Sequence, residues 1–415
     1  MRRGTNLPRV GDFNQMVVLD QVRRAPDGSS RSELAAGTGL SLQAVSNIVA
    51  RLIAHGYVVE GERRSAGRGK PRTMLYLDPR GAYALGTHID PVVVTSVLVD
   101  LDGRTVEKVV EPTPAGPEAV AASVAEATDA MLRRAGVDPA AVLGLGVAAP
   151  GPVDLDAGTV LRPPLLDGWG EVPVRDLLAA ATGFDVVLGK DVSAAMVAEL
   201  WRGNRMLRGT SLFFYSGFGV AVAVAHDGEL LSGTSRNAGE VGHLVVDSDG
   251  PLCDCGNRGC IGVSAAPATL VAEAVAGGVL PPDTPASSPW ELDAALTTLC
   301  RLAGDGDALA TRILEVSARR VARGITVVAD LVDAGVVVFG GPAWARLAPH
   351  YLPEVRRELT LQSTLREVHP VEVLGSAVGD HVGAVGAASL VLDGLFTPRP
   401  SGLVEASPPG AAVRS

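Results

Sequence analysis

The sequence predicts an α/β protein of two or three domains, and three observations indicate it. From Tyr83 onward, apolar runs of strand length alternate with longer helical patterns. The 415 residues are 47% hydrophobic but only 4% aromatic, with 49 glycines and 28 prolines, so the cores consist mainly of Ala, Val and Leu on a turn-rich chain. The first 80 residues differ in charge from the rest, which indicates a separate amino-terminal module.

The charge difference suggests what that module contacts. Residues 1–80 contain 13 Lys and Arg against 7 Asp and Glu, whereas the remainder contains 23 against 39. A basic module on an acidic body suits a protein that meets a polyanion at one end, and nucleic acid is the first candidate. Asp12 and Asp20 interrupt any apolar signal segment, and no run of 18 apolar residues occurs. We therefore expect a soluble, cytoplasmic protein without a membrane partner.

Residues 32–52 have the spacing of a helix-turn-helix. Ala35 lets two helices cross closely, Gly39 supplies a tight turn, and Val45 and Ile48 face the core. Ser41 can cap the second helix, whose outer side is free to enter a major groove. The DNA-contact candidates there are Ser41, Leu42, Gln43, Ser46, Asn47 and Arg51. An ordinary helical hairpin with a polar face is the alternative interpretation.

A basic loop follows, flanked by strand patterns over residues 58–61 and 73–77. Glycine-rich cationic loops of this kind suit phosphate contacts or insertion into a minor groove. The cationic candidates are Arg63, Arg64, Arg68, Lys70 and Arg72. A helix-turn-helix followed by such a wing favours binding of double-stranded DNA over a merely solvated charged surface.

The body begins with a buried strand region over residues 84–101, which ends in the turn 100–103, and a helix over 117–135 follows. Another strand and turn cover residues 142–153. This order resembles an actin-like ATPase fold, in which a ligand cleft separates two lobes. Residues 398–415 have the composition of a flexible tail.

The strongest local chemistry is a cluster of metal-binding residue types. Three of the four cysteines lie within eight residues, shortly after a histidine, and the four candidate ligands are His243, Cys253, Cys255 and Cys260. One imidazole and three thiolates form a closed tetrahedral set for structural zinc, and we expect one zinc ion per chain. The alternative is three buried, reduced cysteines beside an unrelated histidine.

These features together resemble the ROK family (repressors, open reading frames and sugar kinases), in its repressor branch. The resemblance covers residues 10–395 and implies a winged helix, a sugar-kinase-like body with a zinc knuckle, and a transcriptional role. The expected domains are a DNA-binding domain over 1–80, a small lobe over 81–190, a large lobe over 191–395 and a tail over 396–415. Beyond the winged helix, the matching segments are Gly103, 150–153, 167–169, Asp191 with Ala194, Ala195 and Glu199, 239–243, the knuckle 253–260, 340–342 and 375–388.

The phosphate-binding turns of the family's kinases are altered in this chain. The family pattern Asp-x-Gly-Gly-Thr corresponds here to residues 88–92, in which Pro91 has no amide hydrogen and Val92 has no hydroxyl group. In the second turn, Phe218 stands where a hydrogen-bond donor is expected. Asp191 occupies the position of the catalytic base and is the vestigial base candidate. We therefore expect no ATP binding and no phosphotransfer, with an ATP-dependent sugar kinase fused to a DNA-binding head as the alternative.

The sugar-binding positions are altered as well. Family positions that contact sugar hydroxyls read Leu165, Lys190, Asp191, Glu240, His243 and Gly262 here, so three polar contacts are missing. The ligand-binding candidates that remain are Lys190, Asp191, Glu240 and His243. Lys190 either serves as a cation for an altered or acidic effector, or it pairs with Asp191 or Glu240 and fills an inactive site. Both interpretations stay open.

The resemblance thus predicts a regulator, expected to repress carbohydrate-related genes, that binds a palindromic operator as a homodimer or tetramer. A sugar or sugar derivative is the expected effector. A constitutive repressor that binds no ligand is the third hypothesis.

Overall fold

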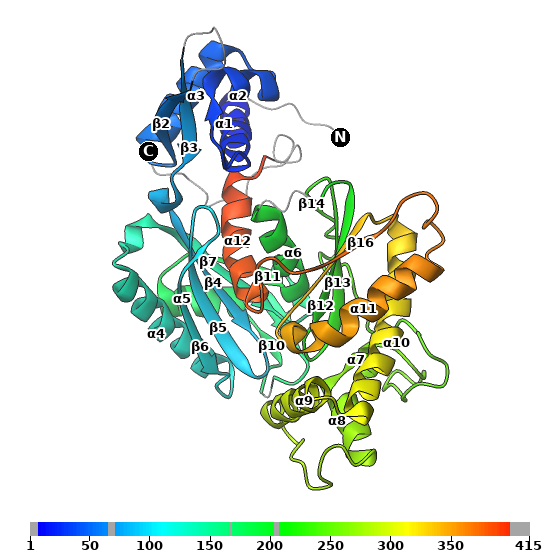
Figure 1. Cartoon of the computed structure of the whole chain (residues 1–415). Helices are drawn as coiled ribbons and strands as arrows, with labels where there is room; N and C mark the ends of the chain where they lie inside the picture. The colour runs from blue at the N-terminus through cyan, green and yellow to red at the C-terminus, as the bar shows by residue number, and fades with distance from the viewer. Residues whose placement is uncertain (1–6, 65–70, 167, 203–206, 399–415) are drawn as a thin grey trace.

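The computed structural model describes residues 7–64, 71–166, 168–202 and 207–398, with side chains described from residue 11 onward. The chain forms a small helical domain above two α/β lobes that lie side by side (Figure 1). Arg68, Lys70 and Asp167, which the sequence analysis singled out, lie outside the described residues, as do most of the predicted tail and the start of the first predicted domain.

The small domain is a winged helix with its own core. Three helices and a three-stranded sheet enclose apolar side chains that include Leu34, Val45 and Leu75, all fully buried. Its elements are α1 (Leu7–Arg23), β1 (Ser29–Ser30), α2 (Arg31–Thr38), α3 (Leu42–Ala54), β2 (Val58–Arg64) and β3 (Arg72–Leu77), with the strands in the order β1-β3-β2.

Local sequence explains where these helices begin and end. Ser30 and Glu33 form a capping box at the start of α2, in which each side chain bonds the other residue's backbone amide. Gly39 ends α2 in the left-handed conformation, with a φ of 72°. Ser41 then caps α3, its hydroxyl accepting from the amide of Ala44 at 3.2 Å. The predicted helix-turn-helix is confirmed.

The first lobe is built on a mixed five-stranded sheet in the order β11-β7-β4-β5-β6. Alternate residues of its strands face opposite sides, so Leu98 packs under α4 whereas Val97 and Val99 face α6 and α12. The elements are β4 (Tyr83–Ile89), β5 (Val93–Asp100), β6 (Thr105–Pro112), α4 (Pro117–Ala135), β7 (Val142–Ala149), α5 (Val174–Thr182), β11 (Val186–Lys190), α6 (Asp191–Trp201) and α12 (Val382–Phe396). A small sheet of β8 (Val153–Asp154), β9 (Thr159–Leu161) and β10 (Glu171–Val172) lies beside it.

The buried strand region 84–101 is two antiparallel strands, β4 and β5, and the tight turn between them lies within the predicted phosphate turn at 88–92. Pro91 has no amide to give to a ladder, and the Asp90 carboxylate accepts from the amide of Val92 at 2.9 Å, which stabilises the turn.

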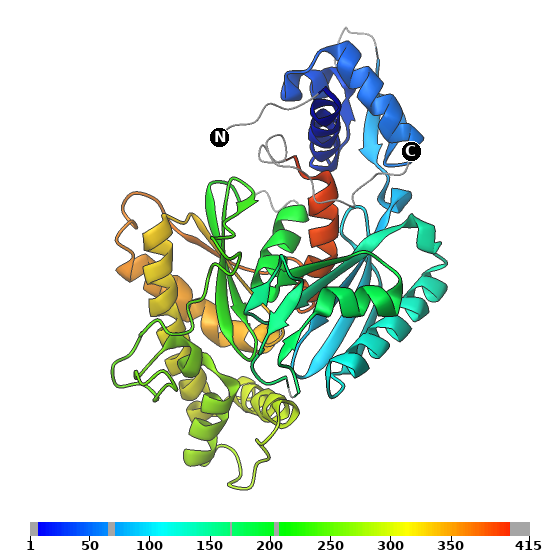
Figure 2. The same ribbon diagram turned by 180° about the vertical axis from the view of Figure 1, so that it is seen from behind.

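The second lobe has another five-stranded sheet, in the order β14-β13-β12-β15-β16, covered by helices on its outer face. Figure 2 shows from behind that the two lobes meet along α6 and α12. The elements are β12 (Thr210–Ser216), β13 (Val220–His226), β14 (Glu229–Leu230), α7 (Ile261–Ala265), α8 (Pro267–Ala276), α9 (Pro289–Gly304), α10 (Ala308–Val332), β15 (Val336–Gly340), α11 (Trp344–Gln362) and β16 (Glu372–Gly375).

Helix α12 lies unusually close to the first sheet, because glycines face it. A Cβ atom added to Gly146 of β7 would lie 1.7 Å from the carbonyl oxygen of Ala387, and one added to Gly86 of β4 would lie 2.2 Å from that of Ala384. Although α12 falls within the predicted large-lobe range, it packs on the first-lobe sheet. The predicted domain boundaries stay predictions.

Two contacts attach the winged helix to the body. The guanidinium group of Arg23 in α1 donates to the carbonyl oxygen of Trp201 and lies 4.1 Å from the centre of its indole ring. The ring of Phe396, at the end of α12, meets that of Tyr57 edge to face at 5.2 Å. The two body helices that contact the winged helix are therefore α6 and α12. Within the described residues, no helix is long and apolar enough to span a bilayer.

The close packing of α12 predicts the effect of a single methyl group. We expect Gly146→Ala to lower the free energy of unfolding by about 2–3 kcal/mol, because backbone atoms of α12 would have to move. The measurement is urea denaturation, with Gly170→Ala as the control, since a Cβ atom there meets nothing within 4 Å. Equal midpoints for the two variants would contradict the packing.

Candidate functional site

Helix α3 presents one apolar and one polar face. Val45, Ile48 and Leu52 are buried in the winged-helix core. The predicted DNA-contact residues Gln43, Asn47 and Arg51 lie on the exposed face. Leu42, at the start of the helix, is 56% exposed and adds an apolar group to this face. The face has the mixture of amide, cationic and apolar groups that can contact base edges.

Two local hydrogen bonds shape this face. The side-chain amide of Gln43 donates to that of Asn47 at 3.2 Å, so the two act as one polar unit one turn apart. The hydroxyl of Ser46 donates to the carbonyl oxygen of Leu42 at 2.8 Å and is half-buried. Ser46 is therefore less available for DNA contacts than its neighbours on the helix.

The wing candidates flank the hairpin tip. Arg64 ends β2 and pairs in register with Arg72, which begins β3, while Arg63 is opposite Thr73. These three arginines are exposed, and Arg72 lies 4.0 Å from Glu33. They form a cationic edge on the same small domain as α3.

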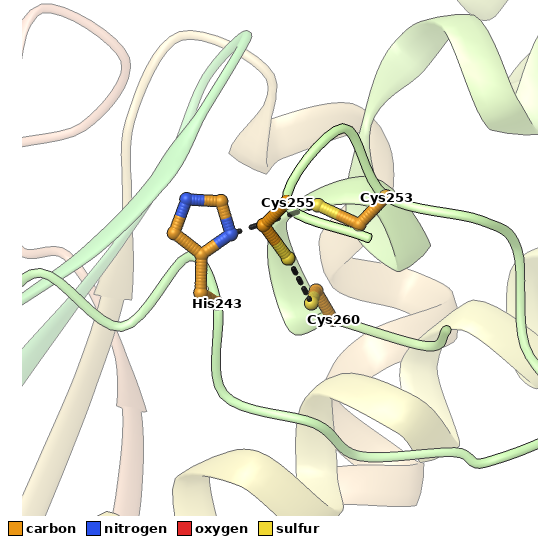
Figure 3. A group of neighbouring side chains, drawn as sticks. All are labelled: His243, Cys253, Cys255 and Cys260. Carbon is orange, nitrogen blue, oxygen red and sulfur yellow. Dashed lines mark hydrogen bonds between the residues drawn. The ribbon is translucent and has the colours of Figure 1, made fainter. Parts of the chain in front are cut away.

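The four predicted metal ligands converge in the second lobe. The donor atoms of His243, Cys253, Cys255 and Cys260 all lie within 4.8 Å of one another (Figure 3). His243 Nδ1 is 3.6 Å from Cys253 Sγ, and Cys255 Sγ is 3.6 Å from Cys260 Sγ. Ligands of a tetrahedral ion with metal–sulfur bonds of about 2.3 Å lie about 3.8 Å apart, so the donor spacing fits a bound metal. We call these four residues the metal cluster.

Backbone hydrogen bonds hold the metal cluster together. The amide of Cys253 donates to the carbonyl oxygen of Asn257 at 2.8 Å, which folds the first two cysteines into a tight turn. Gly259, with a φ of 64°, lies so close to Asp247 that a Cβ atom would be 1.6 Å from its carbonyl oxygen. Cys260 is the N-cap residue, directly before α7. The turn is therefore set by backbone geometry as well as by its ligands.

Three of the four predicted ligand-binding residues lie where the two lobes meet, and we call this contact the cleft. Lys190 ends β11 and Asp191 begins α6, whereas Glu240 comes from the second lobe after β14. Lys190 Nζ donates to Glu240 Oε1 at 2.5 Å. The Lys190 side chain is 3% exposed and that of Glu240 is 61% exposed. Of the two interpretations of Lys190, the structure contains the ion pair, and binding of an acidic effector stays a prediction.

Asp191 is unusual among the carboxylates of the chain. Burial raises its pKa to about 7, although the amide of Val192, which donates to it at 2.6 Å, and the nearby Lys190 ammonium oppose the rise. Burial therefore favours the neutral form of this carboxyl group. His243 presents Nδ1 to Cys253, which places this side chain with the metal cluster, and its predicted contact with an effector stays a prediction.

The altered phosphate turns border a small cavity of about 220 Å³ between the lobes. Asp90 and Phe218, from the two turns, line it together with Asp293 and Arg346, which form an ion pair of 2.7 Å. Burial raises the pKa of Asp90 to about 6, so this carboxyl group is largely ionised at pH 7. A buried carboxylate beside the first turn repels phosphate groups.

Sequence reasoning did not assign several residues that the structure makes important. Asn237 of the second lobe forms two hydrogen bonds with the backbone of Val153 in the first. Glu199 accepts from Ser376 and so stabilises the loop that leads into α12. Arg23 joins the winged helix to α6. Each contact links residues at least 80 positions apart, so no local sequence pattern predicts it.

Comparisons with known proteins follow this division of the chain. The ROK family profile matches residues 86–394, and the MarR family profile matches residues 7–69. The DNA-binding transcriptional dual regulator NagC of Escherichia coli K12 is 24% identical over 369 residues, which are 87% of this chain and 88% of NagC. The glucokinase of Thermotoga maritima is 29% identical over 301 residues, which are 71% of this chain and 92% of that enzyme.

A solved structure shares the whole arrangement. The crystal structure of a ROK family transcriptional regulator, a homologue of the E. coli MLC protein, covers 96% of this chain and 100% of its own, with a TM-score of 0.74 and 20% identity. This likeness shows that the winged helix and both lobes form one known fold.

The metal cluster predicts metal content directly. We expect about one equivalent of a divalent metal per purified chain, and a large loss of it in Cys255→Ser, because three ligands bind far more weakly than four. Elemental analysis after dialysis measures this. Cys300→Ser is the matched control, since Cys300 lies outside the cluster. A fully folded wild-type protein without metal would refute the site.

Proposed function

This chain belongs to the ROK family, and from that premise we propose that it is a DNA-binding transcriptional regulator of carbohydrate-related genes, acting as a repressor. The exposed face of α3 supports the proposal most, because its polar groups project from a helix whose other face is fixed in a core. The arginines of the wing would contact phosphate groups on either side. NagC and the MLC homologue, which resemble this chain over most of its length, are regulators.

The metal of the cluster is zinc, in a structural role. Three thiolates and one imidazole prefer zinc to magnesium or calcium, and four protein ligands leave no open position for catalysis. The cluster begins three residues after Glu240, so a bound ion would also fix one wall of the cleft.

The kinase-like body does not transfer phosphate. A nucleotide at the altered turns would meet the buried Asp90 carboxylate and the Phe218 ring, neither of which can donate a hydrogen bond to phosphate at neutral pH. Asp191 would be left as a base without a positioned phosphoryl group. The cleft instead serves as an effector site for a sugar or sugar derivative, with Lys190, Asp191, Glu240 and His243 as its polar groups.

DNA is contacted by two copies of α3 in a two-fold assembly, which requires a palindromic operator. Because the winged helix is attached to α6 and α12, a change in the angle between the lobes would change the separation of the two heads.

Asn47→Ala tests base reading. We expect it to relax base preference at one operator position and to cost about 1–3 kcal/mol on the preferred operator, with little effect on non-specific DNA. The measurement is a set of binding titrations at fixed salt on an operator obtained by selection and on single-base variants of it.

Arg63→Ala is the comparison that separates the two kinds of contact. It should weaken all sequences alike and reduce the salt slope by about one, because it removes a phosphate contact. Arg301→Ala, in α9 and distant from the winged helix, is the matched control. Equal losses on every sequence for Asn47→Ala would contradict its reading role, and wild-type protein that selects no sequence would refute the regulator.

A coupled ATPase assay over a panel of sugars tests the absence of phosphotransfer. We expect no turnover above background, because the first phosphate turn lacks its donors and carries a carboxylate. Turnover that disappears in Asp191→Asn would establish the kinase alternative instead.

A further inference from the structure

Lys190 is buried, whereas a lysine that binds a ligand at the entrance of an open site would be exposed to solvent. Its side chain is 3% exposed, and its ammonium group is bonded at 2.5 Å to a carboxylate from the other lobe. Glu240 itself is 61% exposed, so solvent can reach the pair from the Glu240 side. A charge-assisted hydrogen bond in such a position is stronger than one between neutral groups.

The surroundings of Lys190 are fitted to its stem. A Cβ atom added to Gly151 would lie 3.2 Å from Lys190 Cε and 3.5 Å from Glu240 Oε1. The lysine stem therefore runs over the backbone of Gly151 on its way to Glu240. The space that the stem crosses is the contact between the lobes, at the carboxyl end of β11.

Two further links cross between the lobes beside this ion pair. The amide of Val153 donates to Asn237 Oδ1 at 2.9 Å, and Asn237 Nδ2 donates to the Val153 carbonyl oxygen at 2.8 Å. Arg236 lies 3.0 Å from Asp156. Asn237 and Arg236 belong to residues 231–240, which we call the bridging segment.

The bridging segment is fixed to the second lobe, so these links join the lobes and not merely a loose loop. The amide of Leu231 donates to Val224, and the amide of Val222 donates to Gly239 at 3.0 Å, which ties both ends of the segment to β13. A Cβ atom on Gly239 would lie 1.5 Å from the Val222 carbonyl oxygen. Glu240 follows directly and therefore cannot move far without the second lobe.

From this geometry we propose that the Lys190 side chain fills the cleft and holds the lobes closed through its ion pair with Glu240. In this position Lys190 determines which effectors can enter the cleft. The inference rests on the proposed role of the cleft as an effector site. A neutral monosaccharide can donate hydroxyl groups to the Glu240 carboxylate, but it carries no positive charge to replace the Lys190 ammonium in the ion pair. The cleft therefore excludes ligands of that class, and an effector must carry a charged group to open it.

The amide of Val153 reports closure directly, because its hydrogen-bond acceptor, Asn237, lies across the cleft. We expect this amide to exchange about ten to a hundred times faster in Lys190→Met and in Glu240→Gln, which each remove one partner of the ion pair. The measurement is hydrogen–deuterium exchange mass spectrometry on the full chain, with fragmentation that resolves single amides. Arg301→Met, which removes an exposed ion pair of similar length in α9, should change nothing.

A double variant tests whether the two residues act as one pair. In the double variant Lys190→Met, Glu240→Gln, the Val153 amide should exchange no faster than in either single variant. If the effects of the two substitutions on the exchange rate add up, the proposal is overturned. If Lys190→Met also speeds exchange of the β12 amides in the core, the substitution has disturbed folding in general. The test then rests on Glu240→Gln, because the exposed Glu240 side chain is not needed for folding. Unchanged Val153 exchange in Glu240→Gln overturns the proposal.

These measurements use no DNA. A chain that selects no operator would refute the regulator and leave the exchange result standing, so the two failures are distinguishable.

Discussion

The close approach of α12 to the first sheet is the constraint on which the remaining arrangement depends. Gly86 and Gly146 remove the side chains that would hold the helix away, and α6 packs along its other side. The two helices then form a shared layer between the sheets, because Phe213 and Ala223 of the second sheet pack on the same core as Val97 and Val99 of the first. The lobes therefore share a helical layer, in addition to the contacts that the bridging segment makes between them.

The metal cluster and the cleft share one short segment of the chain, residues 239–243. Gly239 is pressed against β13, and His243, four residues later, belongs to the metal cluster. Glu240 lies between these two fixed points, which limits how far its backbone can move. The candidate metal ligand His243 and the cleft residue Glu240 thus depend on the same few peptide units.

Features that depend on the spacing of nearby residues could be predicted from the sequence. Features that depend on contacts between distant segments could not. The helix-turn-helix and the four metal ligands follow from the order of Gly39, Ser41 and the clustered cysteines. The partner of Lys190 stayed open between Asp191 and Glu240, because the deciding residue is 50 positions away and comes from the other lobe. The resemblance predicted a turn at residues 88–92, but the hydrogen bond from the Val92 amide to the Asp90 carboxylate, which shapes that turn, was visible only in the structure.

Through the edge-to-face contact between Phe396 and Tyr57, α12 connects the first lobe to the winged helix. The helix has 15 residues and spans about 22 Å, with one part wedged on the first sheet and its far end against the DNA-binding head. A rotation of the first lobe would therefore carry the winged helix, and α3 with it, through this contact. Small adjustments between the lobes would thereby change the position of α3 relative to the body.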